Sequence, residues 1–244
     1  MSSRLRIATL DSGVFANHPH IQRPVLGGVT ITADGQAEGF EDTLGHGTAV
    51  CALLQKMAPD ADIFSVKIFD SHLATSLSIV LRAIDWCLRQ RIDIVNLSLG
   101  TANRDHLPQF IAAIDQVSKN KTLLVSAYQA NNVRMLPGSL PSVIGVAEDP
   151  TCPRKYTRFI ESPTSHAAAC PYALDIHGVP REHNLHGVSF AVAHVTAHIA
   201  RLWHASGPGA GTSTEWLHRL KIDRPVPAPL FNSKHSLDTA LERN

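Results

Sequence analysis

The stretch IDIVNLSLG, residues 92–100, decides the fold of this chain of 244 residues. It is a near-continuous apolar run, which is typical of a strand buried on both faces inside a parallel sheet. Residues 74–89 precede it and carry apolar side chains at the 3.6-residue spacing of a helix. Residues 107–117 follow it and are a second helix candidate. A buried strand between two helices predicts a parallel arrangement in which strands and helices alternate.

The same alternation extends in both directions from this strand. Further strands are predicted by short apolar runs at residues 6–10, 62–69, 122–127 and 142–147. Further helices are predicted by apolar periodicity at residues 47–57 and from Ser189 to residue 205. We therefore expect an α/β fold in three layers, with a mostly parallel central sheet and helices on both faces.

The end of the chain is expected to be less regular. Thr212 and Glu215 have the spacing of a capping box, so a short helix should begin there. Residues 223–230 are rich in proline and predict an irregular connection, and residues 236–241 suit a last helical turn. Because no internal repeat or low-complexity linker divides the sequence, we expect residues 1–244 to form a single domain.

The composition excludes several classes of protein. A hydrophobic content of 44 % allows a sizeable core, and a net charge of +1 argues against binding nucleic acids or membrane surfaces through bulk charge. No apolar run approaches the roughly 18 residues that a membrane span needs. The N-terminal residues MSSRLRIATLDSG lack an apolar segment of signal-peptide length and a small-residue cleavage site. We therefore expect a cytoplasmic protein.

The cysteines and histidines do not predict a metal site. The four cysteines are widely spaced and form no CxxC pair, so we expect Cys51 and Cys87 to be reduced core residues and no disulfide framework. His194 and His198 have the i, i+4 spacing of a metal pair on a helix. The segment lacks the glutamate of HExxH, however, and no third ligand is evident. The sequence therefore predicts no metal and no cofactor.

Three polar residues stand where the functional side chains of such a sheet gather, at the carboxyl ends of strands and at helix starts. Asp11 ends the first strand in LDSG, His46 opens the first helix in GHGT, and Ser189 lies near the start of the last long helix in HGVSFAVAHV. Each has a simpler interpretation, as a turn former, a loop histidine and a helix cap. Together they are the three side chains of serine hydrolysis, in the chain order Asp, His, Ser.

Several longer segments around these residues follow one another in a fixed order. They are IATLDSGVFANHPHI (7–21), GHGTAVCALL (45–54), VKIFD (66–70), IVNLSLG (94–100), PSVIGVA (141–147), GVSFAVAHVTA (187–197) and HSLDTAL (235–241). In this order they resemble the motifs of the subtilisin-like serine proteases, peptidase family S8. The resemblance implies a single subtilisin-like peptidase domain and an acyl-enzyme mechanism on Asp11, His46 and Ser189.

The resemblance also implies how a substrate binds. Ser98, Leu99 and Gly100 match the strand that, in this family, binds an extended peptide by strand addition. The family's oxyanion loop reads Ala-Ala-Gly-Asn, whereas this chain has SAYQANN at residues 126–132. Without a gap, Gln129 takes the place of the asparagine and keeps an amide donor. If the loop is rearranged instead, Asn131 or Asn132 supplies the donor, with Asn131 as the first candidate.

Other departures from the family pattern refine the expected function. The segment after the helix at 47–57 leaves no room for the calcium-binding insertion of many members, and we expect a compact form that has no propeptide. Both features favour an intracellular processing endopeptidase that cleaves an extended peptide segment, such as the leader of a peptide natural product. Two alternatives remain open. One is a pseudoprotease that binds peptides through the strand at Ser98–Gly100 and, because of its altered oxyanion loop, does not cleave them. The other is an acyl-transferring peptide ligase or macrocyclase. An α/β-hydrolase esterase is disfavoured because GVSFA lacks the second glycine of G-x-S-x-G.

Overall fold

The structure is a computed structural model that describes residues 4–161, 164–206 and 211–222. Within these residues the strands of the main sheet are β1 (Arg6–Asp11), β2 (Gly27–Ile31), β3 (Gln36–Ala37), β4 (Asp62–Lys67), β5 (Ile94–Leu97), β6 (Leu123–Ala127), β9 (Ile144–Glu148), β10 (Arg158–Ile160) and β11 (His166–Ala169). Their order across the sheet is β10-β11-β9-β6-β5-β1-β4-β2-β3. Neighbours from β11 to β2 are parallel, and the two edge strands pair antiparallel. The predicted mostly parallel sheet is confirmed.

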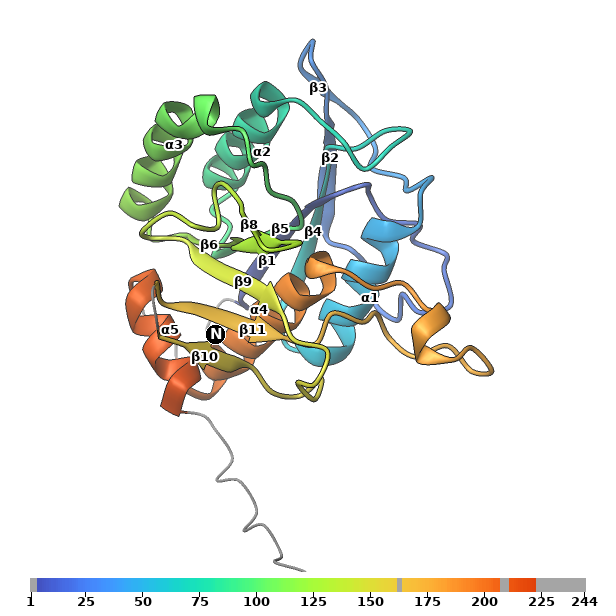
Figure 1. Cartoon of the computed structure of the whole chain (residues 1–244). Coiled ribbons are helices and arrows are strands. Elements are labelled where there is room, and N and C mark those ends of the chain that lie inside the picture. Colours follow the sequence, from blue (N-terminus) through green and yellow to red (C-terminus); the bar gives the residue numbers. More distant parts are fainter. Residues whose placement is uncertain (1–3, 162–163, 207–210, 223–244) are drawn as a thin grey trace, which may run out of the picture.

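Helices cover both faces of this sheet, which completes the predicted three layers (Figure 1). The helices are α1 (His46–Met57), α2 (Leu77–Arg89), α3 (Leu107–Lys119), α4 (Val188–Ser206) and α5 (Ser213–Ile222). Side chains of α1, α4 and α5 form one apolar core with one face of the sheet. Side chains of α2 and α3 form a second core with the opposite face. A central strand such as β5 is thus buried on both sides, which explains its near-continuous apolar sequence.

Most predicted elements are present, with bounds that the local chemistry explains. The apolar run at 92–100 is a strand only over β5, because the chain leaves the ladder at Ser98. Helix α2 begins at Leu77 rather than at residue 74, since the Ser76 hydroxyl caps it by accepting a hydrogen bond from the Ile79 amide at 3.4 Å. The predicted capping box is confirmed, because the Thr212 amide donates to Glu215 Oε2 at 2.6 Å and the Glu215 amide donates to Thr212 Oγ1 at 3.3 Å.

Some elements were not predicted. Strand β2 reads GGVTI, and a Cβ on Gly28 would lie 2.2 Å from the Ser65 carbonyl oxygen of neighbouring β4. Strand β11 reads HAAA and carries no β-branched residue, so its strand conformation comes from pairing with β9 rather than from propensity. The expected features at 223–230 and 236–241, and the motif segment at 235–241, lie outside the described residues.

The cysteines behave as expected of core residues. Cys51 and Cys87 are buried and free, and burial raises the pKa of the Cys51 thiol to about 12. Within the described part of the chain, none of the helices has the length and apolar character that crossing a bilayer would require.

Candidate active site

Asp11 is the last residue of β1, near the middle of the sheet, and its side chain is buried. Its Oδ1 atom accepts two hydrogen bonds at 2.7 Å, one from the Ser12 amide and one from Nδ1 of His46. Its Oδ2 atom is buried and has no hydrogen-bond partner within the described residues. The structure therefore joins the first two predicted residues, which lie 35 positions apart in the sequence.

His46 is the first residue of α1, and Asp42 fixes the turn that leads into this helix. One Asp42 oxygen accepts from the amides of Leu44 and Gly45, each at 2.9 Å. The other accepts from the Thr48 amide at 2.9 Å and from the Thr48 hydroxyl at 2.6 Å. Burial raises the pKa of Asp42, but these hydrogen bonds outweigh burial and hold the pKa below its usual value. The negative charge of this carboxylate also interacts favourably with the positive N-terminal end of the helix dipole.

Asp42 was missed in the sequence. The sequence does contain a pattern that could have indicated it. Asp42 precedes the hydroxyl residue Thr48 by six positions, and α1 begins between them at His46.

The surroundings of His46 prepare its imidazole to accept a proton. Burial alone would lower the pKa of His46. The hydrogen bond and the charge of Asp11, together with the charge of Asp42, outweigh burial, so the pKa lies above its usual value of 6.5. With Nδ1–H donating to Asp11, the neutral ring presents an unprotonated Nε2. The neutral, base-competent fraction of His46 therefore grows as the pH rises through this elevated pKa.

Two glycines let the chain just after β1 lie close to α1 and to the segment that leads into α1. A Cβ on Gly47 would lie 2.3 Å from the carbonyl oxygen of Gly13, and a Cβ on Gly13 would lie 2.3 Å from that of Phe40. Gly13 also has a φ of 103°, which disfavours other residues. Across this contact the Gly47 amide donates to Ser12 Oγ at 2.8 Å. Backbone contact thus sets the position of His46 relative to Asp11.

Ser189 is the second residue of α4, and its hydroxyl donates to the backbone carbonyl of Ser98 at 3.1 Å. The ring of Phe190, the next residue, lies 5.4 Å from the ring of His46. Among the described residues, no helix amide is found to donate to this hydroxyl, as it would to a helix cap. Ser189 therefore lies in the same region as Asp11 and His46.

A polar chain anchors this end of β5 to α4. The Thr196 hydroxyl donates to Asn96 Oδ1 at 2.9 Å, and Asn96 Nδ2 donates to the Ser98 hydroxyl at 2.9 Å. All three side chains are buried. These hydrogen bonds hold Ser98 in place beside Ser189. Asn96 is therefore a positioning residue, and it was not predicted from the sequence.

Comparison with known proteins identifies the family of this chain. The family model described as "Subtilase family", Peptidase_S8, matches residues 2–157. The chain belongs to the subtilase family. Within the family it is 32 % identical over 132 residues to the minor extracellular protease Epr of Bacillus subtilis, a match that covers 50 % of this chain and 19 % of that protein. It is 27 % identical over 134 residues to the intracellular serine protease of Paenibacillus polymyxa, with 50 % and 40 % covered. These matches span less than half the length of either relative.

Solved structures share the fold of this subtilase over most of its length. A cold-adapted subtilisin-like serine proteinase has a TM-score of 0.65 at 19 % identity, with 89 % of this chain and 81 % of that chain covered. A lanthipeptide protease has a TM-score of 0.64 at 17 % identity, with 88 % and 78 % covered. The prenylagaramide maturation protease PagA has a TM-score of 0.62 at 21 % identity, with 87 % and 81 % covered. At these identities the likeness shows the fold.

In this subtilase the segment Ser98–Gly100 continues from β5 as an irregular edge. The Leu99 carbonyl accepts from the Ser126 hydroxyl at 2.9 Å, and Thr101 forms an antiparallel bridge with Leu136. Among the described residues, no hydrogen-bond partner is found for the backbone N–H and C=O of Gly100. An edge with free backbone groups is the feature that strand addition needs.

The expected oxyanion segment forms a hairpin. Strands β7 (Gln129–Ala130) and β8 (Val133–Arg134) pair antiparallel, and Asn131 and Asn132 connect them with φ values of 49° and 62°. Two positive φ values define a type I′ turn, for which asparagine is well suited. The two asparagines thus have a conformational role, both are exposed, and Gln129 is half-buried.

Tyr128, the residue before Gln129, has its own structural role in this subtilase. Its side chain is buried and stacks on His166 with 4.1 Å between ring centroids. Its amide donates to the Val146 carbonyl at 2.7 Å, which fixes the start of the hairpin against β9.

The histidine pair on α4 serves the packing of the helix. His194 Nε2 lies 3.2 Å from the Tyr172 carbonyl, and His198 Nδ1 lies 3.0 Å from the Thr157 hydroxyl. Burial lowers the pKa of His194 to about 4, so its ring is neutral at pH 7. Among the described residues, no group of three or more metal-binding side chains comes together.

Proposed function

We propose that this chain is a serine endopeptidase, a single subtilisin-like peptidase domain over residues 1–244, with Asp11, His46 and Ser189 as its catalytic triad. One observation carries the proposal: Nδ1 of His46 lies 2.7 Å from the buried carboxylate of Asp11, while the ring of His46 contacts the residue next to Ser189. Membership of the subtilase family supports it.

In the proposed reaction a peptide pairs with the edge at Ser98–Gly100 as an added strand. The Ser189 hydroxyl leaves the Ser98 carbonyl, gives its proton to Nε2 of His46 and attacks the scissile carbonyl carbon. Asp11 stabilises the imidazolium that results. His46 then protonates the leaving amine, the C–N bond breaks, and an acyl-enzyme remains on Ser189. A water molecule then gives a proton to His46 and attacks the acyl carbon. His46 returns the proton to the Ser189 oxygen, the ester bond breaks, and the acid product leaves.

We further propose that the protease has a dedicated processing role, such as removal of a leader peptide, in the cytoplasm. Two solved proteins of the same fold are named as a lanthipeptide protease and a prenylagaramide maturation protease, and one relative is named an intracellular serine protease. The proposed partner is a peptide or protein substrate bound as an extended strand, and neither a cofactor nor a metal takes part in the proposed reaction.

Labelling with a fluorophosphonate tests the proposed nucleophile. Folded wild-type protein is expected to form a covalent adduct on Ser189, located by mass spectrometry of the digest, because only an activated serine reacts at a useful rate. Heat-unfolded protein and the Ser189→Ala variant should not react. Absence of an adduct on the folded protein would contradict the proposal and favour a peptide-binding pseudoprotease. Formation of a new amide when an amine is added to a cleavable peptide would instead indicate a ligase.

The oxyanion donor has a separate test. We expect Gln129→Ala to lower kcat by about 10² or more and to leave KM nearly unchanged, because the amide would bind charge that develops only in the transition state. Steady-state kinetics on one peptide measures both constants. The hairpin should persist, since its ladder is made by backbone groups.

The matched control is Asn131→Gly, which removes an amide in the same hairpin while tolerating the φ of 49°. We expect it to keep wild-type turnover. Full activity of Gln129→Ala together with loss of activity in Asn131→Gly would assign the donor to Asn131 instead.

A further inference from the structure

A cavity of about 500 Å³ lies against one face of α1. The helix contributes Thr48, Ala49 and Ala52, whose spacing places them on a single helix face. Residues 15–20 and residues 173–185 supply the opposite walls. Neither the proposed reaction nor the edge at Ser98–Gly100 uses this cavity.

The cavity offers an apolar surface to its occupant. Three large apolar side chains on its lining are strongly exposed, namely Phe15 at 41 %, Ile176 at 43 % and Leu185 at 49 %. Exposed apolar side chains that gather around one hollow are a mark of a binding site.

The principal polar groups of the lining already have partners inside the protein. The carboxylate of Asp42 accepts four hydrogen bonds, as described above. Asn184 donates to the Leu174 carbonyl at 2.7 Å and accepts from the Leu185 amide at 2.8 Å. His18 Nδ1 accepts from the His20 amide at 3.1 Å. A ligand would therefore be held by burial of apolar surface rather than by charge.

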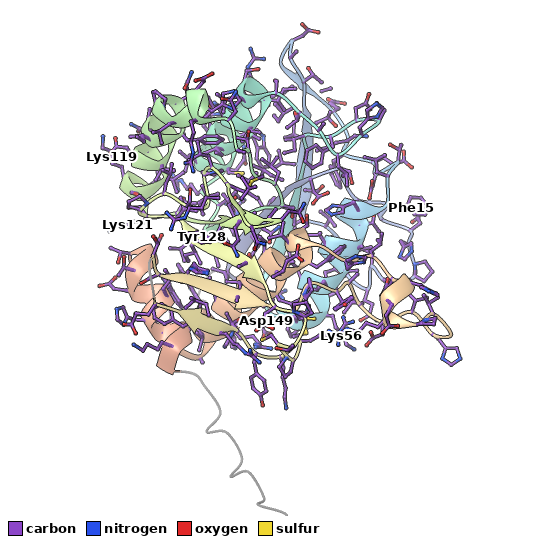
Figure 2. All side chains as sticks on the ribbon, in the orientation of Figure 1. Phe15, Lys56, Lys119, Lys121, Tyr128 and Asp149 are labelled. Atoms are coloured by element: carbon purple, nitrogen blue, oxygen red, sulfur yellow. The ribbon has the colours of Figure 1, made fainter. Side chains whose placement is uncertain are left out.

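The cavity adjoins the proposed triad on the side away from the substrate-binding edge. Its lining includes Gly45, which precedes His46, and Leu185, four residues before Ser189. Of the described residues between 53 and 172, none lines it, whereas the segment that contains Ser98–Gly100 is held by Ser126 and Leu136. Figure 2 shows Phe15, from the cavity lining, well separated from Tyr128, which leads into the hairpin beyond that edge.

The chemistry of the proposed reaction indicates which part of the substrate lies on the cavity side of the triad. His46 must protonate the leaving amine, so the peptide segment that departs has to begin beside His46 and the N-terminus of α1. The acyl part of the substrate occupies the opposite side, along Ser98–Gly100. The departing segment is therefore the part of a substrate that can reach the cavity.

We infer that the cavity binds a large apolar side chain, aromatic or branched aliphatic, of the second or third residue after the scissile bond. This inference rests on the proposed endopeptidase function. The cavity of about 500 Å³ is large enough for such a side chain, because a cavity of roughly 150 Å³ can already hold a benzene ring. The position follows from the lining, which includes Gly45 directly before His46 and Leu185 four residues before Ser189, but neither His46 nor Ser189 itself. Extended residues advance by about 3.3 Å each, so the first departing residue stays at the triad.

The test compares quenched peptides that differ in one residue, phenylalanine or serine, placed second or third after the bond that mass spectrometry shows to be cleaved. We expect kcat/KM to be about tenfold to hundredfold higher for phenylalanine at one of these positions. Ala52→Leu, which fills the cavity, should bring this ratio close to one. Leu185→Ser, on the exposed rim, is a second variant and should lower the ratio without a risk to the core.

A control variant and a third substrate separate the possible failures. Ile111→Ser changes an apolar side chain of α3 that is 55 % exposed on the opposite face of the sheet, and it should keep the wild-type ratio. A peptidyl p-nitroanilide has no residues after the scissile bond. If the wild type hydrolyses it but does not distinguish phenylalanine from serine, the inference is wrong and the endopeptidase proposal stands. The inference is also wrong if Ala52→Leu and Leu185→Ser both keep the wild-type ratio of kcat/KM between the phenylalanine and serine peptides. Absence of hydrolysis of every substrate overturns both.

Discussion

Ser189→Ala is expected to lower kcat for peptide hydrolysis by about 10⁶, the size of effect found for subtilisin, a member of the same family. The variant keeps the substrate edge and any oxyanion donor but has no oxygen that can form the acyl-enzyme. Its residual rate should therefore stay above that of the uncatalysed reaction. Single-substrate kinetics with long incubation and high enzyme concentration measures the fall.

The fold of this variant should be nearly unchanged. It loses one hydrogen bond, from Ser189 to the Ser98 carbonyl, which contributes about 1 kcal/mol to stability. A thermal melt should shift by only about 2–4 °C. Ser118→Ala, at an exposed position of α3, is the matched control and should keep full activity. Turnover of Ser189→Ala within tenfold of the wild type would exclude Ser189 as the nucleophile.

Asp11→Asn is expected to lower kcat by about 10⁴, as the same replacement does in other serine proteases with this triad. The carboxamide has nearly the shape of the carboxylate, but its NH₂ group can donate to Nδ1 of His46. The proton of the neutral imidazole then moves to Nε2, and the atom facing Ser189 loses its ability to accept. The charge that stabilises the imidazolium is lost as well.

The pH dependence of the variant distinguishes this mechanism from a loss of folding. Asp11 raises the pKa of His46, so kcat/KM of the wild type should rise with pH through a midpoint above 6.5. In Asp11→Asn the remaining activity should have its midpoint at lower pH. Asp115→Asn removes a carboxylate from an exposed ion pair with Lys119 on α3 and should change neither kcat nor the midpoint. An unchanged kcat in Asp11→Asn would remove Asp11 from the triad.

The sequence predicted those features that depend on a few neighbouring residues. Strand β5 was predictable because burial on both faces demands apolar side chains at almost every position. The positions of Asp11 and His46 followed from short glycine-flanked motifs at the end of a strand and the start of a helix. Their contact follows from the parallel sheet, which brings such ends to one edge.

Features made by long-range contacts were not predictable. Strand β11 depends on β9, and the cavity depends on residues 173–185 lying over α1, far away in the sequence. Asn131 and Asn132 both carry an amide that could serve as an oxyanion donor, but their positive φ values show that they form a turn. Two consecutive asparagines between short extended segments are in fact a hairpin signal.

The backbone contact between Gly13 and Gly47 has a consequence for how the proposed enzyme would use the binding energy of its substrate. Because Gly47 lets the backbone of α1 lie directly against Gly13, just beyond the end of β1, backbone contact holds the Asp11 carboxylate and the His46 imidazole in place before any peptide arrives. Substrate binding then does not have to reorganise these dipoles, and the interactions along the peptide remain free to favour the transition state. The alignment is also independent of which side chains the substrate carries. We therefore expect changes in the surrounding loops to alter which peptide is bound while the contact between Asp11 and His46 stays in place.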